Sequence, residues 1–456
     1  MNARTGSATQ DLASFSSELV YGDIPDSAVK LAKMLLLDWL GSAIVGSTQK
    51  PAKMLLSIVD KLGGTPESTI VVHARKTSCI NAALVNGAMS HIVELDDVHK
   101  SSILHPGAVV IPAALAMSER EGADGKSLLT AIVAGYDVAI RIGEAVNPSH
   151  YRYWHTTGTC GTFGAAVAAG KILDLDTNAM VNALGSAGTQ AAGLWEFVSN
   201  GSMSKHLHAG KAAANGVLSA LLAKNGFTGA NTIIEGTRGF CEAMSDSYDV
   251  SRMTANLGKQ FRILEVSLKP YASCRHTHSV IDAILKIRSQ TKIRPQDVGR
   301  IRVKTYSAAL QIAGNELPRT PFEAKFSLSY CTSVALVRGK AGLDSFNNES
   351  LNDQAIRDLM GKVEITSDPE FDKQYPEKWP AKAELKTKDG KEYFAMVEFP
   401  LGDPENPIKD EDLQAKFKSL ASVALKPEKV ESIVDSVGST EKITDARLLT
   451  KLLEVG

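Results

Sequence analysis

Apolar residues recur every three or four positions through most of the first 230 residues, which is the period of an amphipathic helix. The segment SAVKLAKMLLLDWLGSAIVG, residues 27–46, shows this most clearly, and Asp26 stands where a helix cap is expected. Within this part of the chain only STIVV, residues 68–72, has the composition of a strand. The same period predicts further helices over residues 78–92, 107–121, 125–144, 157–174, 178–190 and 208–225.

After about residue 265 the pattern changes to the two-residue alternation of half-buried strands. GRIRVKTY (299–306) and KVEIT (362–366) alternate in this way, and AKAELKTKDGKEYFAMVEF (381–399) alternates on both sides of Asp389-Gly390, a strong hairpin signal. Helical patterns return at 278–290, 325–338, 410–424 and 441–454.

We therefore predict a mainly α protein with two domains. A large all-helical domain, 1–266, is completed by C-terminal helices in 403–456, and a smaller α+β lid domain occupies 267–402. The polar segment GDPENP (402–407) is a plausible crossover between them. Helices rich in Ala and Gly, such as GTFGAAVAAGKIL, are expected to pack closely in a buried bundle.

Composition narrows the function. The chain has 456 residues, and 50 basic against 51 acidic residues give a net charge of −1, which argues against a surface that binds nucleic acid. Apolar runs are interrupted well before the roughly 18 residues that a membrane span needs, and no secretion signal is visible. The 5 cysteines are odd in number and form no C-x-x-C pair, so we expect a soluble cytoplasmic protein without a zinc–thiolate site.

The densest polar cluster is ELDDVHKSSILHPG, residues 94–107, between two predicted helices. It places titratable groups before a helix N-terminus, where backbone N–H groups and the helix dipole favour an anion. A solvated charged loop is the alternative interpretation. The candidate side chains are Glu94, Asp96, Asp97, His99, Lys100 and His105.

A second candidate is His155, just before the glycine-rich helix in WHTTGTCGTFG. Gly158, Gly161 and Gly164 are spaced by three, which is not the dinucleotide pattern, so they indicate a close helix contact rather than a phosphate cradle. A lone histidine at such a position is more often a satisfied core residue than a catalyst.

Two further segments combine cations and histidines. SKHLHAG contains Lys205, His206 and His208, and LKPYASCRHTHSVIDA contains Lys269, Tyr271, Cys274, Arg275, His276 and His278. His-x-His with the Asp-Asp pair (Asp96, Asp97, His276, His278) could hold a metal, which is the main competing constellation. Cys274 could also be a nucleophile.

In their order along the chain, these segments resemble the MmgE/PrpD family, which includes 2-methylcitrate dehydratase, cis-aconitate decarboxylase and iminodisuccinate epimerase. The resemblance covers roughly residues 25–340, from AKMLLLDWLGSAIVG through TQAAGLWEF and IIEGTRGF to AKFSLSYCTSVAL. It implies a cofactor-free enzyme, with no metal, and commonly a homodimer. It also implies that the active site lies between a helical domain and a smaller lid.

Matched residue by residue, the family's acid/base and binding groups fall on the Asp-Asp region with His105, on His155, Lys205 and Lys269, and on Tyr330. Val98 and Cys274 stand where the cis-aconitate decarboxylase type has Thr and His. We predict catalytic roles for His105, His155, Asp97, Lys205 and Lys269. We predict substrate-binding roles for Glu94, Asp96, His99, Arg275 and Tyr330.

Such a site suits a reaction in which a carbon acid beside a carboxylate loses a proton or CO₂, because cations can stabilise the added negative charge. The favoured function is a lyase, a dehydratase or decarboxylase, acting on a small di- or tricarboxylate. An epimerase or isomerase of a dicarboxylate is the next alternative. A metal-dependent hydrolase and a non-catalytic binding protein are more distant ones.

Overall fold

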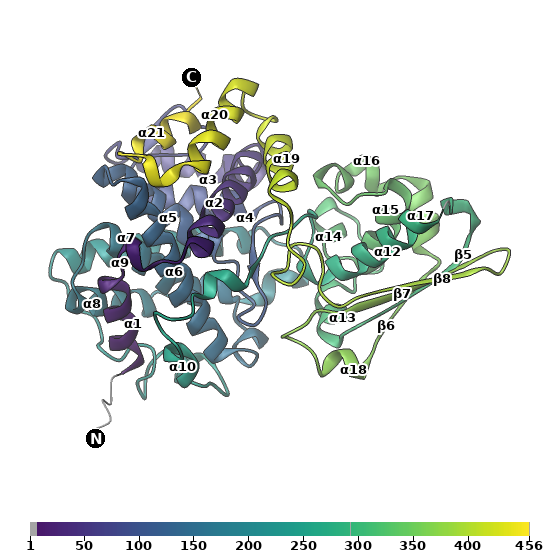
Figure 1. Cartoon of the computed structure of the whole chain (residues 1–456), viewed down its shortest axis with the longest axis horizontal. Coiled ribbons are helices and arrows are strands. Elements are labelled where there is room, and N and C mark those ends of the chain that lie inside the picture. The colour runs from purple at the N-terminus through teal and green to yellow at the C-terminus, as the bar shows by residue number, and fades with distance from the viewer. Residues whose placement is uncertain (1–6, 292, 456) are drawn as a thin grey trace. The chain divides into compact units, whose positions relative to one another are not determined.

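The computed structural model describes residues 7–291 and 293–455. The described residues divide into two compact units: those within 1–92, 96–266 and 409–456 form the first, and those within 93–95 and 267–408 form the second. Helices dominate the first unit, and a small mixed sheet lies in the second (Figure 1). The predicted class, mainly α with a smaller α+β part, is confirmed.

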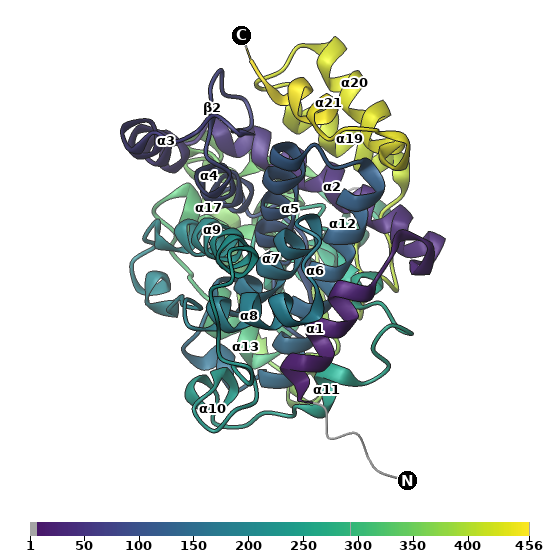
Figure 2. The same ribbon diagram turned by 90° about the vertical axis from the view of Figure 1, so that its left-hand side faces the viewer.

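The first unit is a helical bundle, seen face-on in Figure 2. It also has short strands, β1 (Ser68–Thr69), β2 (Lys76–Thr77) and β3 (Val98–His99). Its helices are α1 (Ala8–Glu18), α2 (Asp26–Ser47), α3 (Lys50–Leu62), α4 (Cys79–His91), α5 (Gly107–Glu121), α6 (Gly125–Val146), α7 (Thr156–Ile172), α8 (Thr177–Gly188), α9 (Ser204–Lys224), α10 (Phe240–Met244), α11 (Ser251–Thr254), α19 (Asp410–Ala421), α20 (Pro427–Gly438) and α21 (Arg447–Thr450).

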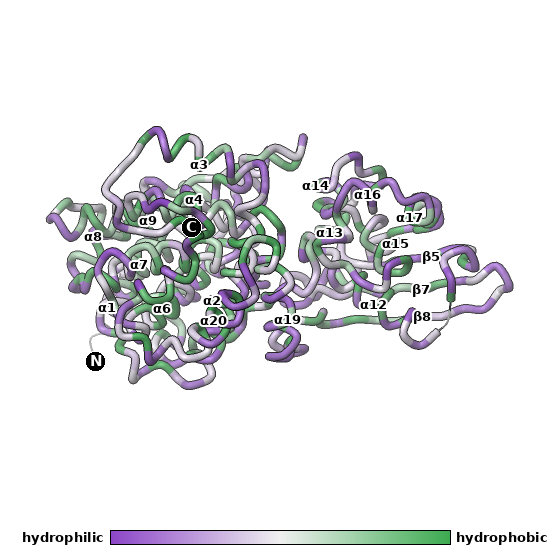
Figure 3. Tube along the Cα trace, turned by 90° about the horizontal axis from the view of Figure 1, so that it is seen from above, coloured by the Kyte–Doolittle hydropathy of each residue, from purple (hydrophilic) through white to green (hydrophobic). Residues whose placement is uncertain are grey.

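Helix α7 lies at the centre of this bundle and packs against α5, α6 and α9. Its glycines permit the close approach: a Cβ on Gly161 would lie 2.7 Å from Val109 of α5, and one on Gly164 would lie 2.6 Å from the Gly135 carbonyl oxygen of α6. The predicted close helix contact is confirmed. Apolar residues dominate α6, whose trace is largely green in Figure 3, and nearly all of them are buried.

Two local predictions in the first unit were wrong. Pro25, not Asp26, occupies the cap position of α2. Asp26 lies in the first turn, where its negative charge interacts favourably with the helix dipole. The predicted strand 68–72 pairs only over Ser68–Thr69, against Lys76–Thr77. The chain turns away at Val72, whose φ of 59° is incompatible with a strand. Strands β2 and β3 were not predicted.

The second unit contains a four-stranded sheet in the order β6-β5-β7-β8. β5 (Val298–Thr305) pairs parallel with β6 (Val363–Ser367) and antiparallel with β7 (Ala381–Thr387), and β7 pairs antiparallel with β8 (Glu392–Val397). The predicted strands and the hairpin at Asp389-Gly390 are confirmed, with Gly390 at a φ of 89°. Its helices are α12 (His278–Gln290), α13 (Ser307–Ala313), α14 (Pro321–Ala324), α15 (Leu328–Arg338), α16 (Asn348–Leu351), α17 (Gln354–Met360) and α18 (Pro369–Asp372).

Alternate residues of β5 and β7 are buried, which matches the period seen in the sequence. α12 packs against β7 and β8, and α15 packs against β6. β4 (Val266–Ser267) is the short strand at the start of this part of the chain.

The C-terminal prediction was right at 410–424 and wrong at 441–454. The latter segment forms only short turns and α21, and α20, at residues 427–438, was not predicted. Among the described residues, no helix is both long enough and apolar enough to cross a bilayer.

Candidate active site

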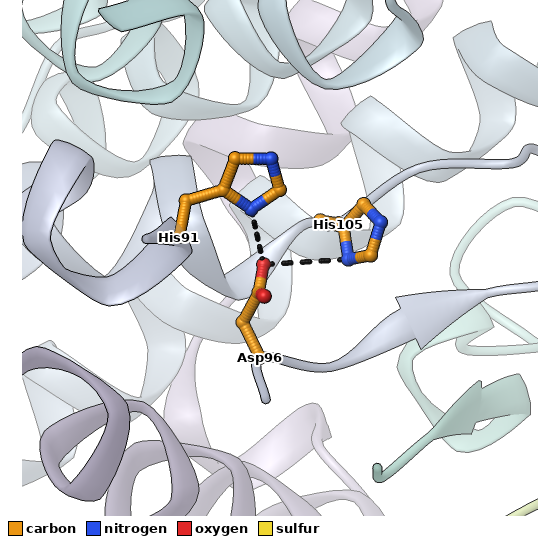
Figure 4. A group of neighbouring side chains, drawn as sticks. All are labelled: His91, Asp96 and His105. Atoms are coloured by element: carbon orange, nitrogen blue, oxygen red, sulfur yellow. Dashed lines mark hydrogen bonds and ion pairs between the residues drawn. The ribbon is translucent and has the colours of Figure 1, made fainter. Parts of the chain in front are cut away.

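Two histidines of the first unit meet one carboxylate oxygen (Figure 4). The Nδ1 atom of His91 lies 2.6 Å from Oδ2 of Asp96, and the Nδ1 atom of His105 lies 3.3 Å from the same oxygen. His91 and Asp96 are buried, whereas the His105 side chain is 14% exposed. Of the three side chains, His105 is the one that solvent reaches.

The local chain path brings these groups together. His91 is the last residue of α4, and the loop that follows carries Asp96 back towards α5. The backbone N–H of His105 donates to Thr157 Oγ1 at 3.1 Å, and the N–H of Gly107, the first residue of α5, donates to Asp97 Oδ1 at 3.0 Å. The loop is therefore fixed at the N-termini of α5 and α7.

The hydrogen bonds of His105 determine its tautomer. Its Nδ1 lies 2.6 Å from the backbone carbonyl oxygen of Asp97. A carbonyl oxygen can only accept, so Nδ1 carries the hydrogen and Nε2 carries the lone pair of the neutral ring. The nearby Asp96 carboxylate favours the protonated ring. This arrangement suits a general base.

His155 precedes α7 and lies in an aromatic surrounding. Its ring stacks on His91 with centroids 5.5 Å apart and meets Trp195 edge-on at 5.1 Å. Its Nδ1 lies 3.2 Å from Nδ1 of His208, so one of these two nitrogens donates and the other accepts.

Burial lowers the pKa of His155 well below its usual value, and the charges of His91, Lys205, His208 and His105 act in the same direction. Burial, with His91 and Lys205, also lowers the pKa of His208 to about 4. Both rings are therefore neutral near pH 7. Lys205, buried in the first turn of α9, lies close enough for its charge to act on both.

Asp97 faces protein groups with both carboxylate oxygens. Oδ2 accepts from the Tyr136 hydroxyl at 2.7 Å, and Oδ1 accepts from the Gly107 N–H. Burial raises the pKa of Asp97 to about 8, helped by the charges of Asp96 and Asp38, while the two hydrogen bonds oppose the shift. Its carbonyl, not its carboxylate, contacts His105.

His99, predicted to bind substrate, belongs to a different polar cluster. Its Nδ1 lies 2.9 Å from Ser102 Oγ, and its Nε2 lies 3.5 Å from a carboxylate oxygen of Glu265. His99 and Arg262 lower the pKa of Glu265 to about 2, against the opposing effect of burial. Both ring nitrogens of His99 therefore contact protein groups.

The remaining predicted residues lie in the second unit. Glu94 is buried there with a φ of 59°, and the Nζ atom of Lys269 lies 3.3 Å from its carbonyl oxygen and 3.6 Å from its carboxylate. The Nζ atom of Lys325 donates to the Val93 carbonyl at 2.6 Å. Two buried ammonium groups thus hold consecutive carbonyls of segment 93–94.

Arg275 and Tyr330 are held by protein groups of the second unit. The Arg275 guanidinium pairs with the buried Asp403 and lies 2.8 Å from Nδ1 of His278. The Tyr330 hydroxyl donates to the Ser345 carbonyl at 2.7 Å. These contacts are those of residues that stabilise a core.

Comparison with known sequences decides the family. The MmgE/PrpD N-terminal domain matches residues 10–253, and the MmgE/PrpD C-terminal domain matches residues 271–440. The chain belongs to the MmgE/PrpD family. The N-terminal match contains the cluster around His91, and Lys269 lies just before the C-terminal match.

Several relatives with known names span nearly the whole chain, and another spans about half of it. The cis-aconitate decarboxylase of Aspergillus terreus is 28% identical over 99% of this chain and 96% of its own length. The human cis-aconitate decarboxylase is 26% identical over 98% of this chain and 95% of its own. The 2-methylcitrate dehydratase of Salmonella typhimurium is 24% identical over 51% of this chain and 50% of its own.

In this MmgE/PrpD chain, two groups of described side chains are close enough together to hold a metal: His91, Asp96 and His105, and His99, Glu144 and Glu265. In the first group, Nδ1 of His105 donates to the Asp97 carbonyl, so that nitrogen has no lone pair for a metal. The hydrogen bonds of His91, Asp96 and His105 therefore favour a site for proton transfer over a metal site. In the second, Arg262 lies 3.3 Å from Glu144 and already supplies a cation.

The alternative metal set predicted from the sequence has other partners. His276 Nδ1 lies 2.7 Å from the Tyr306 hydroxyl, and its ring stacks on Trp379 at 4.4 Å. His278 contacts Arg275, and Asp97 contacts Tyr136 and Gly107. Cys274 is buried, as are the other four cysteines.

His91 was not predicted from the sequence, although its ring contacts those of both His105 and His155. It ends a helix of mostly apolar residues, where a lone histidine is usually a core residue. Its position in the sequence could have indicated a role in the site, because His91 stands five residues before Asp96, on the segment that leads into the polar cluster.

Proposed function

We propose that this MmgE/PrpD chain is a lyase that uses acid/base catalysis on a small tricarboxylate or dicarboxylate, without a metal or organic cofactor. The observation that carries the proposal is the setting of His105. Its Nδ1 donates to the Asp97 carbonyl, its Nε2 is the basic nitrogen, and a carboxylate lies 3.3 Å behind it.

In the proposed reaction, His105 Nε2 takes a proton from the carbon beside a substrate carboxylate, or returns one to it. The bond electrons remain on that carbon as an enolate-like carbanion. A dehydratase then expels hydroxide, which leaves as water once protonated, and a decarboxylase forms the carbanion by losing CO₂ instead. Proton transfer of this kind contributes about 10²–10⁴-fold.

Cations must stabilise the added charge on an already anionic substrate. We assign this role to Lys205, whose charge already acts on His155 and His208. From the sequence resemblance we also assign Lys269 to a substrate carboxylate. We assign Asp97 to positioning, because its carbonyl orients His105.

The choice of a lyase is supported by the relatives, which are cis-aconitate decarboxylases over the full length and 2-methylcitrate dehydratase over half of it. The second candidate is an epimerase of a dicarboxylate. Val98 and Cys274 depart from the cis-aconitate decarboxylase pattern, which argues against that activity but does not choose between a dehydratase and an epimerase. Incorporation of deuterium from D₂O, without loss of water or CO₂, would select the epimerase.

The test is a screen of the purified protein on 2-methylcitrate, cis-aconitate and iminodisuccinate, followed by His105→Gln and Lys205→Ala on whichever substrate turns over. Each variant should lose at least tenfold in turnover, which is about 1.4 kcal/mol. His73→Gln is the matched control, because the His73 ring contacts the Arg75 backbone and lies outside the cluster. Full activity in both site variants would reject the assignment.

We also propose a homodimer in a reducing, cytoplasmic compartment. The five cysteines are buried and form no disulfide in the part of the chain that the structure describes, which supports the compartment. Light scattering of the purified chain would test the dimer: the monomer mass is 48.7 kDa. Elemental analysis of the same sample would test the absence of a metal.

A further inference from the structure

His91 lies between the two histidines to which the sequence assigned the chemistry. Its ring is 5.0 Å from that of His105, in an edge contact, and 5.5 Å from that of His155, in a stacked one. It is completely buried. Nothing in the proposed mechanism uses it, yet it contacts Asp96, His105 and His155.

We propose that His91 is a positioning residue of this acid/base site: it anchors the Asp96 carboxylate and thereby limits how strongly that carboxylate favours a protonated His105. The inference rests on the proposed role of His105 as the base. It adds a residue that sets how basic that histidine is.

The distances on the shared oxygen support this. An ionised carboxylate only accepts, so His91 Nδ1 donates to Asp96 Oδ2 at 2.6 Å, while His105 Nδ1 lies 3.3 Å from the same atom. The shorter bond belongs to His91. A hydrogen bond donated to the carboxylate disperses its charge, so less of that charge is available to a protonated His105.

The other nitrogen of His91 distinguishes this role from simple packing. Its Nε2 is buried and has no hydrogen-bond partner among the described atoms. An unsatisfied buried polar atom costs about 1–3 kcal/mol, which an apolar side chain at this position would avoid. A residue that served only to fill space would not need the imidazole. The Nδ1–H donor is what the imidazole provides.

Several charged groups surround the cluster, so a test must separate their effects from that of His91. Asp38 acts on Asp97, and positive charge from Lys205 acts on His155 and His208. The titratable and charged groups around His91 are Asp96, Asp97, His105, His155, His208 and Lys205. The measurement must therefore report on His105 itself.

The experiment is a pH titration of ¹⁵N-histidine-labelled protein by NMR, with the His105 signals assigned through His105→Gln. His91→Leu removes the donor, and His91→Asn keeps it, because the Asn amide nitrogen takes the place of Nδ1. We expect the pKa of His105 to rise by about half a unit or more in His91→Leu and to stay within about 0.2 units of the parent in His91→Asn.

His91→Gln is a second variant of similar size to the parent side chain, with its amide nitrogen displaced towards the Nε2 position. It should behave like His91→Leu, and it keeps the test decisive if the leucine variant does not fold. Equal pKa values in all folded variants, or equal shifts in Asn and Gln, would overturn the proposal. The titration needs no substrate, so it stands apart from any failure to find turnover.

Discussion

Two groups of buried polar residues, one in each unit, differ in how their polar atoms are used. In the first unit, His91 and His105 both contact the same carboxylate oxygen of Asp96. His155 and His208 form one hydrogen bond between their Nδ1 atoms, in which either nitrogen can be the donor. In the second unit, Arg275 and Tyr330 each have a dedicated protein partner, Asp403 and the Ser345 carbonyl.

This difference distinguishes residues suited to proton transfer from residues that stabilise the fold. A side chain that is held by a dedicated buried partner, as Arg275 is by Asp403, serves to stabilise the fold. Groups that share an oxygen or a proton can redistribute protons at small cost, as an acid/base site requires. Burial alone does not distinguish the two kinds, since Arg275 and His91 are both buried.

The largest expected effect is on stability, at Arg275. Arg275→Met leaves the buried Asp403 without its cation, which should cost about 3–5 kcal/mol in the free energy of unfolding by urea. Asp403→Asn added to this variant should recover part of the loss. Arg294→Met, which removes an exposed ion pair with Asp297, should change stability by no more than about 0.5 kcal/mol.

The activity of Arg275→Met tests the alternative, in which Arg275 binds substrate. If Arg275→Met were as stable as the parent but inactive, Arg275 would be a substrate-binding residue, as the sequence predicted. The proposed contrast between the two units would then be lost.

The next prediction compares two lysines of the second unit. Lys269 and Lys325 both hold carbonyls of segment 93–94, but only Lys269 is assigned to substrate. Lys269→Met should therefore lower kcat/KM at least about tenfold more than Lys325→Met. Equal losses in the two variants would mean that both lysines act only by holding the segment.

Much of the fold was readable because it depends on local periodicity. The helices around α5, α6 and α12 and the hairpin of β7 and β8 follow directly from apolar spacing and from Asp389-Gly390. The errors arose where that signal is weak. Residues 441–454 have a helical spacing, yet the chain breaks there into short turns.

The site was less predictable, because its contacts join residues far apart in sequence. The role of His105 was suggested by its place before Pro106-Gly107, but its tautomer depends on a carbonyl eight residues away. His91 was missed because an apolar helix conceals it. No sequence pattern could have shown that Tyr330 is directed at Ser345.

A pH-dependent effect with a comparable upper limit is expected at Asp97. Its pKa is about 8 in the folded protein and close to 4 when unfolded, so in between the folded state holds a proton that the unfolded state has lost. Stability should therefore be full below about pH 4 and fall towards pH 8, by at most about 1.4 kcal/mol per unit.

Asp97→Asn removes this titration. The difference in unfolding free energy between variant and parent, measured by urea at several pH values, should move in favour of the variant as the pH rises through this window. A constant difference from pH 4 to pH 8 would show that Asp97 is already ionised, and so that its carboxylate resembles Asp96 more than we infer.

The smallest effect is of opposite sign, at His208. Its pKa is about 4 when folded and about 6.5 when unfolded, so here the unfolded state binds the extra proton. Its contribution to stability should be full above about pH 6.5 and be lost as the pH falls towards 4. His208→Gln should lose that dependence, and His73→Gln should keep it. Because His208 is partly exposed, solvent screens the effect, and it should be smaller than that at Asp97. If both histidine variants kept the parent's acid sensitivity, burial of His208 would not be the source of that sensitivity.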